Sequence, residues 1–306
     1  MPCHGSSYGS GTPCGRVQPQ SAVLAQCTRL LSCHVSEAEL IAQTSTPRTR
    51  RSLAEDLRTA GLQAGDVLVL HSSLKAVGWV AGGPVAVLLA FQDVLTEGGT
   101  LIVPTHTSNL TDPAGWQSPP VPTEWVPIIQ ESVPAFDPAR TPTRDMGIIP
   151  ETLRSWPGAK RSAHPHVSFA AWGRHADDIT RDHQLEWSMG EGSPLHRAYG
   201  LNAKTMLLGT RKCTSLHLAE ALSRTVDTTT AAAAVIQHGR RAWVTFRDWV
   251  YSTDMFPEIL DAFCAEHHVE TQRIGNASTL LLSQSALVDF AVSFLQQNPR
   301  QDSPEQ

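Results

Sequence analysis

The chain has 306 residues, of which 41% are hydrophobic and 17% are charged, and its formal net charge at pH 7 is −5. This composition suffices for a sizeable core and argues against a polyanionic partner such as nucleic acid, whereas a small cationic substrate suits an acidic chain. No apolar run approaches the roughly 18 residues that a membrane-spanning helix needs. We therefore expect a cytoplasmic protein, monomeric or homodimeric, without a membrane partner.

The N-terminal part differs from the rest. Residues 1–20 are rich in Gly, Ser and Pro without periodicity, which predicts disorder, and residues 21–31 are apolar enough for a short helix. We expect a disordered or weakly structured extension over residues 1–45 and one domain over residues 46–300.

The first half of this domain alternates helices with strands. Apolar spacing and turn residues predict a helix over residues 51–61, a strand over 66–70, a helix over 85–95 and a strand over 100–104. Such an order is typical of an α/β sheet with helices on its faces.

The strand over residues 66–70 runs directly into a polar passage that contains glycine, residues 71–78 (HSSLKAVG). Its lysine, hydroxyl groups and backbone amides suit an anion. The passage matches neither a Walker loop nor a GxGxxG fingerprint, and an ordinary strand-to-helix connection would look similar.

Residues 105–138 form a long excursion rich in proline and tryptophan. An excursion of this length inside a compact domain is typical of a functional loop or lid. Its carboxylates would make it a wall for a cationic ligand, and a solvated surface loop is the alternative. The carboxylates are Asp112, Glu124, Glu131 and Asp137.

The second half predicts further helices and strands. In chain order we expect a helix over residues 141–156, a turn into a buried strand over 161–173, helices over 176–182 and 195–199, a strand over 205–208, a helix to about residue 224, a hairpin of strands 228–237 and 241–246, a helix over 255–267, a strand over 276–282 and a helix over 285–297. Ser193 is expected to cap the helix over 195–199. On a strand His164 and His166 would point the same way and so suit a metal, although spacing ties no third ligand to them.

His217 and Glu220 stand three residues apart on the predicted helix, so they share a face. Thr214 or Ser215 is expected to cap this helix. A strand that feeds a helix opening with a histidine and a carboxylate is where α/β proteins tend to place chemistry. The alternative is a pair on a solvated helix face.

Several motifs in order resemble the aminoglycoside 3-N-acetyltransferase family, which has the antibiotic N-acetyltransferase fold and is distinct from the GNAT acetyltransferases. The resemblance runs from about residue 49 to residue 295. The motifs are His71-Ser72-Ser73-Leu74-Lys75-Ala76-Val77-Gly78, Arg161-Ser162-x-His164-Pro165, Gly190-Glu191-Gly192-Ser193-Pro194 and His217-x-x-Glu220.

The resemblance implies a three-layer α/β/α sandwich with a central mixed sheet. It implies acetyl-CoA as co-substrate, and transfer of the acetyl group to a primary amine, the 3-amino group of 2-deoxystreptamine. It implies no metal and no catalytic cysteine. The family's catalytic histidine maps onto His217. Its cofactor-binding residues map onto His71, Ser72, Ser73, Leu74, Lys75, Val77 and Gly78, with Ser168 expected nearby.

Attack on a thioester requires a neutral amine, so we expect His217 to act as general base. A carboxylate must orient it, and both Glu220 and Asp248 are open candidates, the other then contacting the substrate. The tetrahedral intermediate bears an oxyanion, for which the amides around Ser72 and Ser73 and the hydroxyl of Ser168 are candidates. Further candidates for contacts to the cationic substrate are Asp112, Glu124 and Glu191.

Two other classes of function stay open. One is a metal-dependent hydrolase that uses His164, His166, His217 and Glu220. The other is a relative that binds CoA and either acetylates a different amine or serves only as a binding protein.

Overall fold

The computed structural model describes residues 36–298. By its internal contacts the chain divides into two units, Met1–Ser36 and Glu37–Gln306, and the sheet and helices belong to the second. The disorder expected over residues 1–20 and the short helix over 21–31 lie outside the described residues. Within the extension predicted over residues 1–45, helix α1 (Glu37–Gln43) is formed; the domain boundary itself stays a prediction.

Seven strands of the described residues form one mixed sheet, in the order β3-β4-β2-β1-β5-β9-β8. The central strand β1 pairs in parallel with β2 and with β5, and the other neighbours pair antiparallel. β2 is buried along its whole length and β1 almost so, as expected for strands covered on both faces. The strands are β1 (Val67–Ser72), β2 (Thr100–Pro104), β3 (Lys160–Arg161), β4 (Phe169–Gly173), β5 (Lys204–Leu208), β8 (Gln272–Ile274) and β9 (Ala277–Ser283).

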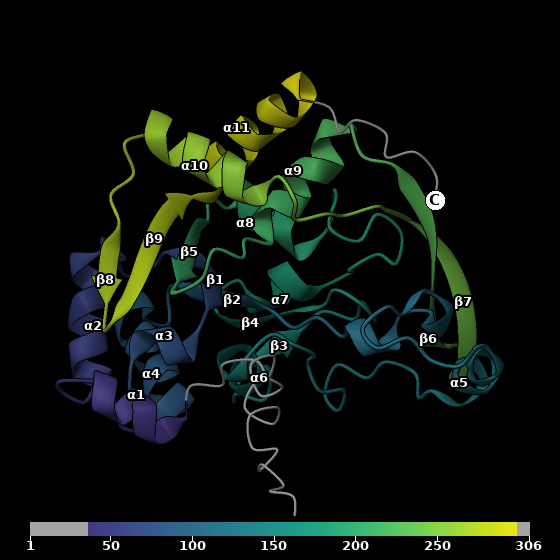
Figure 1. Ribbon diagram of the computed structural model, residues 1–306, viewed down its shortest axis with the longest axis horizontal. Coiled ribbons are helices and arrows are strands. Elements are labelled where there is room, and N and C mark those ends of the chain that lie inside the picture. Colours follow the sequence, from purple (N-terminus) through teal and green to yellow (C-terminus); the bar gives the residue numbers. More distant parts are fainter. Residues whose placement is uncertain (1–35, 299–306) are drawn as a thin grey trace, which may run out of the picture. The chain divides into compact units, whose positions relative to one another are not determined.

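Helices cover both faces of this sheet and enclose two apolar cores (Figure 1). One face carries α2 (Arg50–Thr59), α4 (Gly83–Leu95) and α6 (Ile148–Arg154). The other carries α7 (Ala176–Thr180), α8 (Pro194–Gly200), α9 (Ser215–Ser223), α10 (Phe256–Glu266) and α11 (Gln284–Gln297). The predicted three-layer α/β/α sandwich with a central mixed sheet is confirmed.

The predicted hairpin is confirmed as a separate two-stranded sheet of β6 (Thr228–Gln237) and β7 (Arg240–Trp249), longer in its second strand than predicted. The end of the hairpin that carries its turn lies beside α5 (Val126–Ser132) (Figure 1). Arg241 of the hairpin donates to the carbonyl of Val133 at 2.7 Å, and the Phe136 amide donates to the carbonyl of Ala234. The proline-rich excursion is thus tied to the hairpin.

The helix predicted over residues 141–156 is shorter than expected, because only Ile148–Arg154 is helical. The backbone amides of the preceding segment donate to acceptors other than helix carbonyls. The Thr143 amide donates to Glu151 at 2.9 Å and the Arg144 amide donates to the carbonyl of His106 at 2.8 Å. Apolar spacing alone cannot reveal such long-range partners.

Two smaller features complete the description of the fold. Ser193 caps α8 as predicted, because its hydroxyl accepts from the His196 amide. Among residues 36–298, none of the helices combines the length and the apolar character that crossing a membrane requires.

Candidate active site

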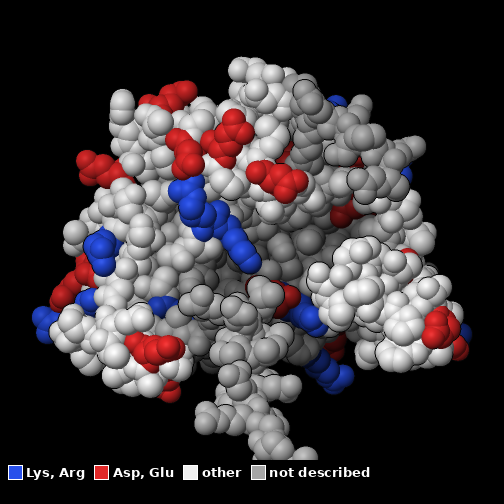
Figure 2. All heavy atoms as spheres, in the orientation of Figure 1, with Lys and Arg blue, Asp and Glu red and all other residues white. Residues whose placement is uncertain are grey.

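Three parallel strands end at one edge of the sheet, and a cavity of about 540 Å³ opens there. Ser72 ends β1, His106 follows β2, and residues 209–214 connect β5 to α9. The carboxyl edge of parallel strands is the usual ligand site of α/β folds. Figure 2 shows a face hollowed near its middle, with Lys and Arg side chains along one edge of the hollow. Residues lining the cavity include Ser72, His106, Asp145, Arg211, Cys213 and His217.

The turn after β5 depends on Gly209. Its φ of +65° is one that side-chain-bearing residues rarely adopt, and a Cβ there would lie 2.2 Å from the Cβ of Ala76. Gly209 therefore lets short helix α3 (Leu74–Val77) pack against the turn that leads to the cavity.

His217 and Glu220 form the close pair that their spacing predicts. His217 Nδ1 lies 2.6 Å from Glu220 Oε2, and Glu220 is fully buried. The other carboxylate oxygen accepts from the Ser252 amide at 3.1 Å. The rings of Tyr251 and Phe256 lie 5.2 and 4.8 Å from the imidazole. With Nδ1 engaged, Nε2 is the nitrogen available for proton exchange.

Asp248 lies in a different environment. Its carboxylate accepts from the amide and the hydroxyl of Ser188, at 3.0 and 2.6 Å, and from the Trp249 amide at 2.9 Å. Burial raises the pKa of Asp248. Of the two carboxylates left open by the sequence, the geometry therefore pairs Glu220 with His217.

The start of α9 is capped differently from the prediction. Thr214 is the residue before the helix, but its hydroxyl contacts His71 Nε2 instead of a helix amide. The Thr214 amide donates to the same nitrogen at 2.8 Å, and the Ser215 hydroxyl pairs with Thr205. Burial and the nearby His217 lower the pKa of His71 to about 3. The neutral ring of His71 thus anchors the segment that carries His217.

The predicted cofactor-binding residues separate into two groups. His71 and Ser72 line the cavity. Ser168 is fully buried elsewhere, because its hydroxyl donates to the Thr105 carbonyl at 2.8 Å and accepts from Arg161 at 3.1 Å. Those not among the lining residues of the cavity are Ser73, Leu74, Lys75, Val77, Gly78 and Ser168.

None of the three carboxylates predicted to contact substrate lines this cavity. Asp112 accepts from the Ala114 amide and from Gln130, both at 3.0 Å. Glu124 and Glu191 are exposed on other segments. The carboxylate that does line the cavity is Asp145, which sequence reasoning missed.

His106 and Cys213 are further cavity residues that the sequence analysis did not single out. The position of His106, directly after the predicted strand over residues 100–104, was a usable signal. Burial raises the pKa of the Cys213 thiol to about 12, so the thiol is protonated at neutral pH and is a poor nucleophile.

His164 and His166 lie in a turn before β4, where their ring nitrogens bind backbone groups. His164 Nδ1 accepts from the amides of His166 and Val167, both at 3.1 Å, and Nε2 contacts the Leu185 carbonyl. His166 Nε2 donates to the Ala232 carbonyl at 3.1 Å. The structure does not bring this pair together with the His217 dyad, and within residues 36–298 no three His, Cys, Asp or Glu side chains gather as metal ligands.

Two buried histidines, His166 and His183, predict a fold that is destabilised by acid. Burial lowers the pKa of both His166 and His183 to about 4. Between pH about 6.5 and about 4 the unfolded chain therefore binds more protons than the native state does. The free energy of unfolding falls over this range by roughly 1 kcal/mol per pH unit per histidine. Urea unfolding at pH 7.5, 6.5, 5.5 and 5.0 measures this slope.

A matched variant identifies the source of the slope. His166→Gln keeps an N–H donor for the Ala232 carbonyl but does not titrate, so its slope should be shallower than that of the wild type. Equal slopes would contradict the assignment.

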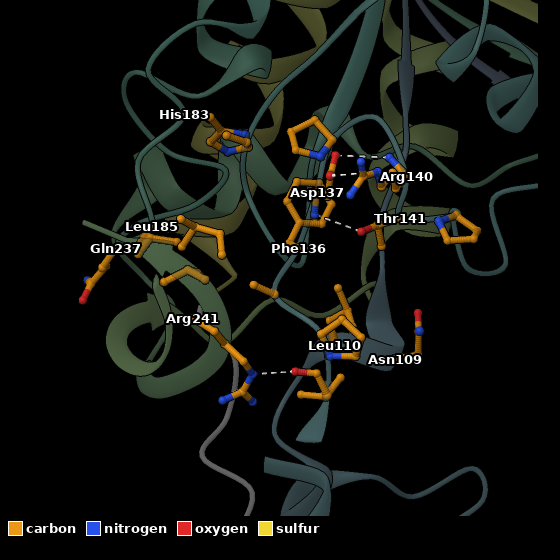
Figure 3. Close-up of a pocket in the computed structure, with 18 residues that line it drawn as sticks. Asn109, Leu110, Phe136, Asp137, Arg140, Thr141, His183, Leu185, Gln237 and Arg241 are labelled. Carbon is orange, nitrogen blue, oxygen red and sulfur yellow. Dashed lines mark hydrogen bonds and ion pairs between the residues drawn. The ribbon is translucent and has the colours of Figure 1, made fainter. Parts of the chain in front are cut away.

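A second cavity, of about 980 Å³, lies between the excursion and the end of the hairpin (Figure 3). Phe136, Leu110 and Leu185 contribute apolar walls. Asp137 is paired within its own turn, because its carboxylate accepts from the Ala139 amide at 2.8 Å and faces Arg140. The wall expected for a cationic ligand is therefore largely apolar here.

Comparison with known proteins places the chain in a family. A family model described as aminoglycoside 3-N-acetyltransferase matches residues 69–296. The chain is 42% identical over 256 residues to the aminoglycoside N(3′)-acetyltransferase-like protein YokD of Bacillus subtilis, covering 83% of this chain and 94% of that protein. The crystal structure of YokD superposes with a TM-score of 0.84, at 40% identity, covering 85% and 98% of the two chains.

Two further relatives agree. Aminoglycoside N(3)-acetyltransferase III of Pseudomonas aeruginosa is 33% identical, over 82% of this chain and 94% of its own. The solved structure of AAC-IIIb in a binary complex with CoASH has a TM-score of 0.74 at 32% identity, over 85% of this chain and all of that one. The chain therefore belongs to the aminoglycoside 3-N-acetyltransferase family, whose members are acyltransferases.

Proposed function

We propose that this acyltransferase moves the acetyl group of acetyl-CoA to a primary amine of an aminoglycoside, the 3-amino group of 2-deoxystreptamine, with His217 as general base. The observation that carries the proposal is the 2.6 Å contact of His217 Nδ1 with the buried carboxylate of Glu220, beside a cavity at the carboxyl edge of parallel strands. The names of the relatives and the CoASH complex of AAC-IIIb support the acceptor and the donor.

The cavity suits an acetyl-CoA thioester. Two of its polar atoms, Ser72 Oγ and His106 Nε2, are buried without a hydrogen-bond partner among the described residues, which is unfavourable unless a ligand supplies one. Arg211 and Lys212 add positive charge to the lining, which favours a phosphate-bearing molecule such as acetyl-CoA.

In the proposed reaction the acceptor's ammonium group first loses one proton to solvent, since an amine must be neutral to attack, and His217 Nε2 then accepts a second proton from that nitrogen as it bonds to the thioester carbon. Glu220 accepts the hydrogen bond from Nδ1–H, which fixes the tautomer and stabilises the imidazolium that forms. His217 then returns the proton to the leaving thiolate. The acetyl group passes directly between the two substrates, and the protonated thiol of Cys213 fits a route without an acyl-enzyme.

A second candidate is acetylation of a different amine. One observation favours it: Asp112, Glu124 and Glu191 lie away from the His217 cavity, where Asp145 is the acidic lining residue. A 2-deoxystreptamine drug carries several ammonium groups, and cationic groups bind best where carboxylates are close.

The test is release of CoA thiol from acetyl-CoA with a panel of 2-deoxystreptamine aminoglycosides, with and without a chelator. We expect rapid, chelator-insensitive release with some members, and mass spectrometry of the product locates the acetylated amine. CoA binding without release from any drug would move the acceptor to another amine. Release that a chelator abolishes would favour the metal-dependent alternative.

A further inference from the structure

Three residues that line the His217 cavity each have a buried polar atom without a hydrogen-bond partner in the described part of the chain. They are His71 Nδ1, Ser72 Oγ and His106 Nε2, and of these the His71 ring is already anchored through Nε2, which accepts from the Thr214 amide. Leaving such a group unpaired costs about 1–3 kcal/mol, so native proteins rarely keep one without a reason. Ser72 Oγ and His106 Nε2 lie in one cavity, which indicates that a bound molecule completes their hydrogen bonds.

Both residues are held by rigid neighbours. Ser72 ends β1, where it pairs in register with Leu208 of β5. The carbonyl of His106 accepts from the Arg144 amide at 2.8 Å, and its ring packs edge-on against Phe169, with centroids 5.4 Å apart. Donors fixed in this way need little rearrangement when negative charge develops on a bound oxygen atom.

The imidazole of His106 is suited to donate a hydrogen bond and not to take up a proton. Burial, then the nearby His217, His71, His183 and Arg161, lower the pKa of His106 to about 3. A ring of such low basicity stays neutral at neutral pH and keeps one N–H to donate. In other enzymes a neutral imidazole polarises a substrate carbonyl group.

We propose that the His106 Nε2–H group and the Ser72 hydroxyl form the oxyanion hole of the acetyl transfer, an inference that rests on the proposed function. As the amine nitrogen bonds to the thioester carbon, the π pair moves to the carbonyl oxygen, where the two groups donate to it. The amine proton goes to His217. Collapse restores the carbonyl bond, breaks the carbon–sulfur bond and gives that proton to the thiolate.

This assignment replaces the hydroxyl of Ser168, which the sequence offered for the same role. The Ser168 hydroxyl already donates to the Thr105 carbonyl and accepts from Arg161. Ser72 and His106 instead follow neighbouring parallel strands into one cavity. His106 thereby becomes a catalytic residue beside His217.

The first test reads the carbonyl directly, without an acceptor amine. Infrared difference spectra of [1-¹³C]acetyl-CoA bound to the full chain should show a carbonyl band at lower frequency than in buffer. His106→Phe and Ser72→Ala should each return part of this shift. His106→Gln keeps a side-chain N–H donor and should preserve it. His267→Phe, an equivalent exchange at a ring stacked on Phe263 away from the cavity, is the matched control.

The second test is kinetic. In His106→Phe, kcat should fall about 10²–10³-fold with little change in KM for acetyl-CoA, and His106→Gln should recover much of the loss. A merely structural role would lower the melting temperature or raise KM instead.

Bound acetyl-CoA with a solution-like carbonyl frequency, or wild-type kcat in His106→Phe, would overturn the oxyanion hole. Failure of acetyl-CoA to bind would remove the proposed function and this inference together. An unsuitable acceptor leaves the infrared result intact, because that measurement needs acetyl-CoA alone.

Discussion

His217→Ala is expected to lower kcat by about 10²–10⁴-fold while the affinity for CoA stays nearly intact. The physical reason is the loss of the nitrogen that takes the amine proton. His217→Asn is the sharper variant, because its amide can still donate to Glu220, which is fully buried and otherwise loses a partner. Steady-state kinetics with the best acceptor and calorimetric titration with CoA measure the two quantities.

The matched control for this experiment is His175→Ala, since His175 faces Asp178 on α7 and does not line the cavity. It should keep wild-type kcat. Near wild-type turnover in His217→Asn with normal folding would remove His217 from the role of base.

Arg161→Ala is expected to destabilise the fold by about 3 kcal/mol, or to lower the melting temperature by roughly 6–12 °C. The guanidinium donates to the Thr105 carbonyl at 2.7 Å and to the carbonyls of Pro138 and Thr141. It also lies over the ring of Phe136, 4.9 Å from its centroid. Its removal leaves the buried Thr105 and the half-buried Pro138 and Thr141 without this donor and frees the segment that leads to Asp145 in the cavity.

Thermal unfolding by circular dichroism tests this, with Arg140→Ala as control. Arg140 lies in the same segment, but it is exposed and its ion pair with Asp137 spans 3.7 Å, so its loss should change stability by less than about 1 kcal/mol. Equal melting temperatures for the two variants would contradict the structural role of Arg161.

The sequence predicts the sheet well where local chemistry decides the structure. The apolar runs at residues 66–70 and 100–104 are strands because both faces of the sheet are covered. It fails where distant partners decide. The segment before Ile148 is not helical because His106 and Glu151 hold its amides.

The same distinction holds for the candidate site. The pairing of His217 with Glu220 follows from helical spacing, so the sequence contains it. The choice between Glu220 and Asp248 depends on long-range contacts, because Asp248 lies in the separate hairpin and binds Ser188. The position of His106 in the cavity depends on strand order across the sheet. A single sequence does not reveal that order, and it therefore offers the Ser168 hydroxyl, beside the amides around Ser72 and Ser73, as an oxyanion donor.

The central pairing of the sheet also has a consequence for the chain during synthesis. Strand β1 takes its partner on one side from β5, so that Leu68 lies opposite Lys204. A chain emerging from the ribosome must therefore carry the apolar β1 with this edge open until most of the domain has been made. Such non-local strand pairing forms slowly, and until it forms the unpaired strand edge is prone to aggregate with neighbouring molecules. We therefore expect soluble yield to improve with slower translation at low temperature or with added chaperones.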